Sequence, residues 1–439
     1  MKKTHYSAIA AMSIVIANMI GTGVFTGLGY QLLSIQDFTA IVLLWIVGGF
    51  LSLCGAFVYA ELGSMFPQSG GEYRYLSDIL HPSLGFLSGW ISCTIGFTAP
   101  LAMSGMAVGN YIKGSIGYGD PLLIGIISLL ILTLIHSTNH AASGGFQSIF
   151  TILKVLVIIA LIIAGFMFGT EDIHKFMPRI NTIQQVFSEP FAISLIYVIF
   201  AYSGWNASAY IASEIRNPRK NLPISIIGGT IIVTILYVLI NMMFLYTAPI
   251  NELMVDITTM LPKELVVIAG SKFLPPFIVS ISGLIIAFML ISSMSSMVVA
   301  GPRVLREMLF EYKLLKNVKS KDNIPVSSIW IQTIIALIMM ITSTYDTLIT
   351  FTTVLITIIS SLTAIAVIYA RFSLKQVERP FKMVGYPATP LLFLMINVWI
   401  LYHITVSKPQ DINIVLAILG LGFIVWGILQ FRNKRLLKL

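Results

Sequence analysis

Long runs of apolar residues, separated by short polar segments, extend over the whole chain. Such runs are typical of transmembrane α-helices, which need about 20 mostly apolar residues to cross a bilayer. Charged residues and segments with glycine or proline separate twelve runs. The pattern predicts twelve membrane-spanning helices, near residues 7–34, 38–65, 83–112, 121–137, 146–169, 190–214, 223–248, 277–301, 327–343, 347–370, 388–406 and 412–431.

The composition agrees with this pattern. Of the 439 residues, 57% are hydrophobic and 10% are charged, and the mean hydropathy is +0.90. Soluble domains are about 45–50% apolar and about 25% charged. The net charge of +9 is spread too thinly to form the basic face of a nucleic-acid-binding protein. The sequence therefore predicts an all-α polytopic protein in a lipid bilayer, and it excludes a soluble enzyme and a nucleic-acid partner.

The basic residues predict the orientation in the membrane. Twelve spans place both termini on the same side, and 20 of the 27 Lys and Arg residues fall on that side. Six lie on the other side, and Lys154 lies inside a span. Because short loops rich in Lys and Arg stay in the cytoplasm, both termini are expected in the cytoplasm, with the chain in the cell (inner or plasma) membrane. No loop has the length of a soluble domain, which favours transport over membrane-anchored catalysis.

Cysteine and histidine residues give no sign of a metal or redox site. Cys54 and Cys93 both lie in apolar runs and are expected to pack as small side chains. Among the six scattered histidines, only His136 and His140 are four residues apart, and no carboxylate accompanies them. No catalytic residue, metal or cofactor is expected.

Two of the predicted spans are interrupted near their middle. The first contains Gly-Thr-Gly at residues 21–23, and the sixth contains Ser-Gly-Trp-Asn at residues 203–206. Each glycine costs a helix about 1 kcal/mol relative to alanine, so both helices are expected to unwind there. The interruptions lie five spans apart, so the second half runs with inverted topology. Paired interruptions of this kind are typical of a transporter site between two repeats.

The interruptions predict a site for an α-amino acid. The first N–H groups of the half-helix beginning at Val24 attract a carboxylate, and the last carbonyls of the half-helix ending near Phe200 attract an ammonium group. A side chain at Gly23 is expected to block the carboxylate without disturbing folding. The predicted substrate-binding residues are Ile20, Gly21, Thr22, Gly23, Val24, Phe200, Ala201 and Ser203.

Three stretches resemble motifs of the amino acid–polyamine–organocation superfamily. Residues 19–25 (MIGTGVF) resemble its first-helix motif, and residues 59–73 (YAELGSMFPQSGGEY) resemble its signature after the second helix. Residues 200–205 (FAYSGW), followed by 214–223 (EIRNPRKNLP), are similar to the sixth-helix region of its L-amino acid transporter branch.

The resemblance implies a LeuT-like fold, a five-plus-five inverted repeat that works by alternating access. The implied units are repeat one at 1–169, repeat two at 190–370 and a peripheral helix pair at 388–432. Three departures from the family pattern stand out. Ser203 occupies a place where this branch often has glycine, which narrows the pocket, and residues 301–308 follow the family pattern only loosely. The segment 113–120 lacks the cysteine by which animal relatives join a heavy chain, so no such partner is expected and a monomer is the simplest form.

Lys154 is the one basic residue deep inside a predicted span. A buried charge there costs about 2.5–3.5 kcal/mol on insertion scales and is a functional candidate by default. It lies some 12 Å, or roughly eight residues, from the helix start, at about the limit of a lysine that reaches for the surface. The resemblance implies a position between helices 1 and 8, where sodium-coupled relatives hold sodium. The ammonium group is expected to bridge the carbonyl of Ala17 or Ile20 to the hydroxyl of Ser293 or a neighbouring serine.

Further residues near the interruptions are candidates for gating. The resemblance places Phe200 where related carriers cap the substrate, so it is the expected outer gate. Trp205 is equally compatible with gating and with packing. Glu61 and the turn at residues 70–73 are expected to form a structured loop rather than a gate.

Together these observations predict a sodium-independent transporter of small or medium neutral L-amino acids that works by exchange or facilitated diffusion. Proton symport through Lys154 is the first alternative, although no acidic residue at that depth offers a relay. A carrier of cationic amino acids or polyamines is the second. A channel or a nutrient sensor on the same scaffold is the third, but the expected polar stripe and soluble output domain are missing.

Overall fold

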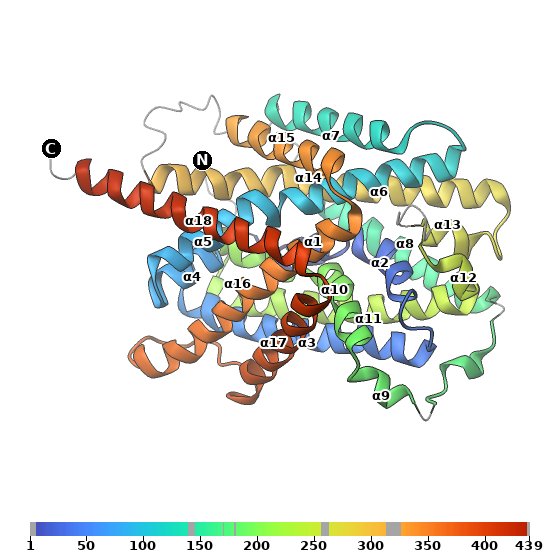
Figure 1. Cartoon of the computed structure of the whole chain (residues 1–439), viewed down its shortest axis with the longest axis horizontal. Helices are drawn as coiled ribbons and strands as arrows, with labels where there is room; N and C mark the ends of the chain where they lie inside the picture. The colour runs from blue at the N-terminus through green and yellow to red at the C-terminus, as the bar shows by residue number, and fades with distance from the viewer. Residues whose placement is uncertain are drawn as a thin grey trace.

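The computed structural model describes residues 6–138, 145–169, 171–179, 181–255, 263–312 and 326–436. Within these residues the fold is all-helical, with one isolated bridge between Tyr6 and Ile215 and no strand. The helices form an elongated bundle in which most of the long ones follow the long axis (Figure 1). The elements, with η1 a π-helix and η2 and η3 3-10 helices, are α1 Ala8–Met19, α2 Gly23–Gln31, α3 Phe38–Met65, α4 Glu72–Ile79, α5 Pro82–Ile91, η1 Ser92–Gly96, α6 Thr98–Ile116, α7 Pro121–Thr138, α8 Gly145–Phe168, η2 Ile173–Phe176, α9 Thr182–Val186, α10 Glu189–Tyr202, η3 Ala207–Glu214, α11 Pro218–Thr247, α12 Ile250–Leu253, α13 Leu265–Gly270, α14 Pro276–Glu311, α15 Val326–Thr342, α16 Tyr345–Ser373, α17 Ala388–Ser407 and α18 Pro409–Leu436.

Among the described residues, eleven helices or runs of consecutive helical elements are long and apolar enough to cross a membrane. The helix at the place of the predicted ninth span, α15, is also apolar but has only 17 residues. The count of twelve spans therefore stays a prediction. The seventh span begins at Pro218 instead of 223, because proline is well suited to the first position of a helix and the helix then continues through Pro223.

The core lies where the interrupted helices meet the rest of the bundle. In the most apolar stretch of each span, 61% of the residues are buried in the first span (α1 and α2), 67% in the sixth span (α10 and η3) and 67% in α16. The corresponding values are 28% in α17 and 17% in α18. The first and sixth spans are therefore largely enclosed by protein, whereas α17 and α18 turn most of their apolar surface outwards. The division into two repeats and a peripheral pair stays a prediction.

The bundle has two distinct ends, which we call the α4 end and the α9 end. In Figure 1, α4 lies to the left, and α9, α12 and α13 lie towards the right. At the α9 end, Thr182 Oγ1 donates to Asp37 at 3.0 Å. At the α4 end, the N-terminal segment is bonded to the end of η3. The Tyr6 N–H donates to the Glu214 carbonyl, and the Tyr6 carbonyl accepts from the Arg216 N–H.

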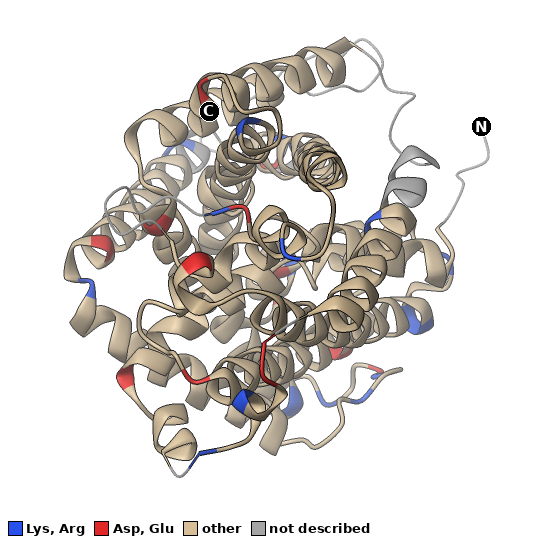
Figure 2. Ribbon diagram, turned by 90° about the vertical axis from the view of Figure 1, so that its right-hand side faces the viewer, with Lys and Arg blue, Asp and Glu red and all other residues tan. Residues whose placement is uncertain are grey.

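Figure 2 shows how sparse the charged residues are across the helical ribbons.

Candidate substrate site

The first span is broken between α1 and α2. Ile20 leaves the helical conformation with ψ of 84°, and α2 begins at Gly23 after the capping residue Thr22. As at any helix start, the first N–H groups of α2 lack partners within the helix. All the predicted residues of this break, Ile20, Gly21, Thr22, Gly23 and Val24, are buried.

The sixth span is broken between α10 and η3. Residues 203–206 form a turn, and the chain continues as a 3-10 helix. The Phe200 carbonyl is not free, contrary to the expectation from the sequence, because it accepts Ser203 N–H at 3.0 Å and Ser203 Oγ at 2.7 Å. Within the described residues, no hydrogen bond reaches the carbonyls of Ala201 and Ser203. These two carbonyls remain as acceptors for an ammonium group.

The two breaks touch each other. A Cβ atom on Gly23 would lie 2.5 Å from Ala201 Cα and 2.7 Å from Ala201 Cβ. Gly204, with φ of +96°, approaches the backbone of Asn18 so closely that a Cβ atom would lie 3.0 Å from its carbonyl carbon. The expectation that a side chain at Gly23 leaves folding intact is therefore wrong, since the first contact of such a side chain is the backbone of the other break.

Lys154 holds the end of the first half-helix. Its side chain is 1% exposed, and its ammonium nitrogen lies 2.7 Å from Ser293 Oγ and 3.5 Å from the Ile20 carbonyl oxygen. Ser293 Oγ itself donates to the Ile20 carbonyl at 3.1 Å. Ala17 is buried on α1, but the ammonium hydrogen bonds within the described residues go to Ile20 and Ser293. The contact thus joins α1, α8 and α14, and its role in transport stays a prediction.

Tyr237 of α11 makes a second tie that the sequence analysis missed. Its hydroxyl donates to the carbonyl of Met19, one residue before the carbonyl held by Lys154. Three helices, α8, α11 and α14, thus cap the carbonyls at the end of α1. A tyrosine in an apolar run reads as core packing, so the sequence carries no signal for this bond.

A layer of three tyrosines closes the breaks towards the α9 end. The Tyr30 ring stacks on Tyr197, with centroids 5.0 Å apart, and on Tyr345 at 6.1 Å. Thr26 and Tyr345 share a hydrogen bond of 2.8 Å. None of the three rings is more than 7% exposed. Phe200, the expected outer gate, is itself 5% exposed.

Towards the α4 end the breaks are less covered. Asn18, Ser203, Gly204 and Asn206 are half-buried. Trp205 packs on α3, with its ring 4.7 Å from that of Tyr59 in an edge-to-face arrangement. The structure therefore favours packing for Trp205, and the partly exposed residues of the breaks lie on the α4 side.

Two buried glutamates lie at this end. Glu61 accepts two 2.6 Å hydrogen bonds from Arg371, which ties α3 to α16. Glu72, in the turn read from the sequence as a structured loop, accepts a hydrogen bond from Asn206 in the sixth-span break. Direct contact between this turn and the break was not expected, because no local pattern links positions 134 residues apart.

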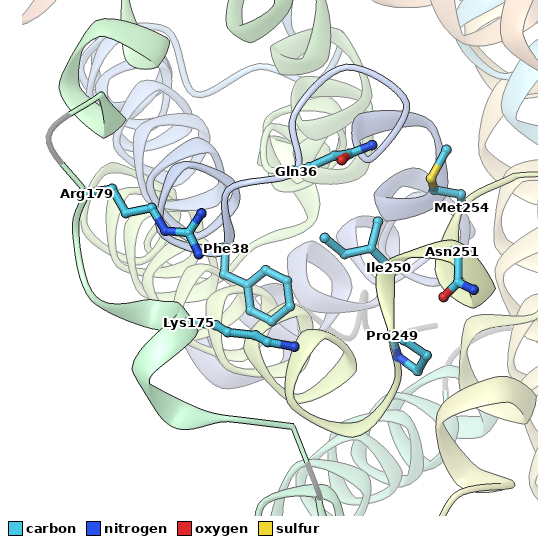
Figure 3. Close-up of a pocket in the computed structure, with 8 residues that line it drawn as sticks. All are labelled: Gln36, Phe38, Lys175, Arg179, Pro249, Ile250, Asn251 and Met254. Atoms are coloured by element: carbon cyan, nitrogen blue, oxygen red, sulfur yellow. The ribbon is translucent and has the colours of Figure 1, made fainter.

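A cavity of about 410 Å³ lies apart from the breaks, at the α9 end. Figure 3 shows Lys175 and Arg179 on one side of it and Asn251 and Met254 on the other, with Phe38 and Ile250 between them. The complete lining is Gln36, Phe38, Lys175, Arg179, Pro249, Ile250, Asn251 and Met254. None of these residues belongs to either break, so this cavity is not the candidate substrate site.

The sequence matches the amino acid permease family over residues 6–426. The chain belongs to this family. The resemblance to the amino acid–polyamine–organocation superfamily is thereby confirmed, and the chain is a multi-pass membrane protein of an amino acid transporter family.

Curated relatives of this permease are similar over most of their length. The serine/threonine exchanger SteT of Bacillus subtilis (strain 168) is 29% identical over 432 residues, 95% of each chain. The human b(0,+)-type amino acid transporter 1 is 27% identical over 91% of this chain and 82% of its own. The human large neutral amino acids transporter small subunit 2 is 27% identical over 97% of this chain and 80% of its own. All three are amino acid transporters by name.

Proposed function

We propose that the chain exchanges small neutral L-amino acids, such as serine, threonine and alanine, across a cell membrane without sodium. The observation that carries this proposal is the contact between the two breaks, in which Gly23 meets Ala201. This contact supports a site in which the first N–H groups of α2 and the carbonyls of Ala201 and Ser203 bind one substrate. A site with backbone N–H groups on one side and backbone carbonyls on the other suits a zwitterion. The N–H groups attract its carboxylate, and the carbonyls attract its ammonium group.

Neutral side chains are favoured by the charges around the breaks. Within the described residues, the one carboxylate that bonds to either break is Glu72, and it lies on the α4 side, held by Asn206. A cationic side chain at the Gly23–Ala201 contact would be buried without a partner, which is costly. The narrow pocket implied by Ser203 and the name of the Bacillus relative both point to serine-sized substrates.

Sodium independence is supported by Lys154. Its ammonium group already occupies the space between Ile20 and Ser293. A second unit charge at about 4 Å would be repelled by about 4 kcal/mol at an effective dielectric constant of 20. The transport mechanism is then exchange or facilitated diffusion. Exchange is favoured, because the ammonium group holds the helices together by a fixed contact.

The proposal includes orientation and organisation. Repeats at 1–169 and 190–370 each open with a span that is broken by a turn. The α4 end is cytoplasmic in this scheme, because most Lys and Arg residues fall on that side.

The chain works without a disulfide-linked heavy chain, since the segment 113–120 has no cysteine. Light scattering of the purified protein tests this last point, and a co-purifying second polypeptide would contradict it.

Counterflow in proteoliposomes tests the proposed function. Vesicles preloaded with unlabelled serine should take up labelled threonine many times faster than empty vesicles. The same uptake is expected when sodium is replaced by potassium on both sides. Uptake driven by a sodium gradient, or no uptake of any neutral amino acid, would contradict the proposal.

A further inference from the structure

The chain between α8 and α10 exposes a group of large apolar side chains. Residues 171–179 and 181–188, which we call the α8–α10 connection, include η2 and α9. Four of their apolar side chains are 54–77% exposed, namely Ile173, Met177, Ile183 and Phe187. Single exposed apolar residues are ordinary on a protein surface, but a group of them marks contact with another molecule or with a membrane.

The opposite face of the α8–α10 connection is fixed to the bundle. The Phe176 ring packs edge-to-face against Phe38 at the start of α3, with the two ring centroids 5.2 Å apart. Thr182 is buried and donates to Asp37, the residue that caps α3. The connection cannot turn over to bury its exposed apolar side chains without breaking these contacts. Those side chains therefore need a partner outside the chain.

The connection begins and ends at one surface of the membrane. The span that contains α8 ends at Phe168, and the span that contains α10 begins at Glu189. In Figure 1, α9 lies at the lower edge of the bundle, outside the long helices. In the interface between headgroups and acyl chains, apolar side chains enter the hydrocarbon and basic side chains reach the phosphates. Lipid is therefore the partner that fits the exposed apolar side chains.

The cavity at the α9 end takes two of its lining residues, Lys175 and Arg179, from the same connection. In Figure 3 both side chains extend towards Phe38. The Lys175 ammonium nitrogen lies 5.6 Å from the centroid of the Phe38 ring. Among the described residues, the lining contains these two cations and no carboxylate. The volume of about 410 Å³ is within the range of small-molecule sites.

The charge at this cavity suits an anion. Glu171 forms an ion pair with Lys175, so this pair adds no net charge. Arg179 forms no ion pair with any described residue. The acids next to these segments do not line the cavity and have other partners, namely Asp37 with Thr182, Asp172 with the His174 N–H and Glu252 with Lys272. Arg179 therefore leaves one positive charge without a counter-charge, and a guanidinium group binds phosphate through two parallel hydrogen bonds.

We propose that this cavity binds the headgroup of an anionic phospholipid. The guanidinium group of Arg179 binds the phosphodiester, and the amides of Gln36 and Asn251 bind the hydroxyl groups of a headgroup such as that of phosphatidylglycerol. The acyl chains then cover the exposed apolar side chains of the α8–α10 connection. A free anion would leave those side chains in water, and a zwitterionic lipid would bring its own cation next to Arg179 and Lys175.

The bound lipid joins separate segments at the α9 end. The cavity is lined by the α8–α10 connection, by the start of α3 and by α12 with its flanking residues. A headgroup in the cavity holds these segments together and stabilises the folded protein, because a ligand that binds only the folded state raises its stability. None of the lining residues belongs to either break, so the lipid site does not depend on the proposed exchange and its test needs no transport.

Native mass spectrometry of the purified protein tests the charged part of the site. Phosphatidylglycerol should bind more tightly than phosphatidylcholine with the same acyl chains. Arg179→Gln should weaken phosphatidylglycerol binding about fivefold, the effect of one basic residue at a charged membrane surface. Lys113→Gln, which removes an exposed basic residue near Glu264 that does not line the cavity, should bind like the wild type. Equal binding of the two lipids by the wild type, or equal binding of phosphatidylglycerol by the wild type and Arg179→Gln, would overturn the proposal.

The apolar part of the site is tested in the same way. Phe187→Ser should weaken the binding of both lipids, because it removes a ring that the acyl chains cover and no charge. Phe277→Ser is the matched control, since Phe277 on α14 is 75% exposed, close to the 77% of Phe187, and it should leave binding unchanged. Unchanged lipid binding in Phe187→Ser, or an equal loss in the two variants, would contradict the role of the apolar face.

Soluble competitors distinguish the lipid from other anions. Glycerophosphoglycerol, the deacylated headgroup, should not displace phosphatidylglycerol at equal concentration, because it lacks the acyl chains, and serine should not displace it either. Displacement by glycerophosphoglycerol would show a site for a soluble anion, and displacement by serine would show a second amino acid site. Either result would overturn the lipid proposal.

Thermal unfolding in detergent separates lost binding from lost folding. Without added lipid, Arg179→Gln should unfold at the wild-type temperature, because Arg179 is exposed and has no ion pair with any residue the structure describes. Phosphatidylglycerol should raise the unfolding temperature of the wild type more than that of Arg179→Gln. An equal rise in both proteins would contradict the proposal.

Discussion

Gly21 and Gly23 look equivalent in the sequence, but the structure predicts opposite responses to alanine. A Cβ atom on Gly23 would lie 2.5 Å from Ala201 Cα, whereas carbon atoms in contact are about 3.5–4.0 Å apart. The overlap of about 1 Å is with backbone, which cannot rotate away, so α2 and α10 must separate. On Gly21 the nearest atom to such a Cβ is the Met19 carbonyl oxygen at 3.9 Å, an ordinary contact.

The cost of Gly23→Ala follows from this geometry. Overpacking typically costs about 1–3 kcal/mol, and a backbone-to-backbone overlap belongs at the upper end. Alanine recovers up to about 1 kcal/mol of helix propensity at the start of α2. The net loss of about 2 kcal/mol lowers the population of conformations with paired breaks about thirtyfold.

The assay is threonine exchange in proteoliposomes at equal amounts of incorporated protein. Gly23→Ala should reduce the exchange rate about thirtyfold. Gly21→Ala should stay near the wild type. So should Gly27→Ala, because a Cβ atom on Gly27 would lie 3.7 Å from Gln31 Nε2 of the same helix and 3.7 Å from Tyr197 Cβ of α10, both ordinary contacts. Wild-type activity in Gly23→Ala, or an equal loss in all three variants, would refute the argument that the close approach of the two breaks forms the site.

Three further predictions follow from individual contacts. Lys154→Ala should still bind serine in a thermal-shift assay but lose most exchange, because the tie between helices is cut; full activity would refute its role. Glu61→Gln should destabilise the detergent-solubilised protein by about 3 kcal/mol in unfolding measurements, at the lower end for a broken buried pair, because the side chains of Arg371 and Arg379 are 21% and 12% exposed and lose their counter-charge. Glu378→Gln should have little effect, because its pair with Arg219 is exposed. Cysteine substituted at Lys175 should react with an impermeant maleimide added outside intact cells and cysteine at Arg219 should not; the reverse pattern would invert the proposed orientation.

The sequence was informative where backbone chemistry decides the structure. Glycine-rich interruptions inside apolar runs predict unwound helices, and both breaks occur where α1 gives way to α2 and α10 to η3. A lone lysine in an apolar run must find oxygen atoms, and Lys154 lies beside Ser293 and the Ile20 carbonyl.

Contacts between distant segments were beyond the reach of the sequence pattern. Tyr30, Tyr197 and Tyr345 each read as ordinary packing residues, and only the fold stacks them into one layer. The bond between Glu72 and Asn206 depends on how η3 docks on α4. The Phe200 carbonyl was expected to be free because the serine hydroxyl three residues later was not counted as a local donor.

Competition against labelled threonine tests most directly the claim that the two breaks bind the two ends of an amino acid. Serine and alanine should compete, whereas ethylamine, the decarboxylated form of alanine, and alanine methyl ester should not, because each lacks the carboxylate that the N–H groups of α2 bind. Arginine and putrescine should compete poorly, since their extra charge finds no partner there. Competition by ethylamine or the methyl ester as strong as that by alanine would contradict the account.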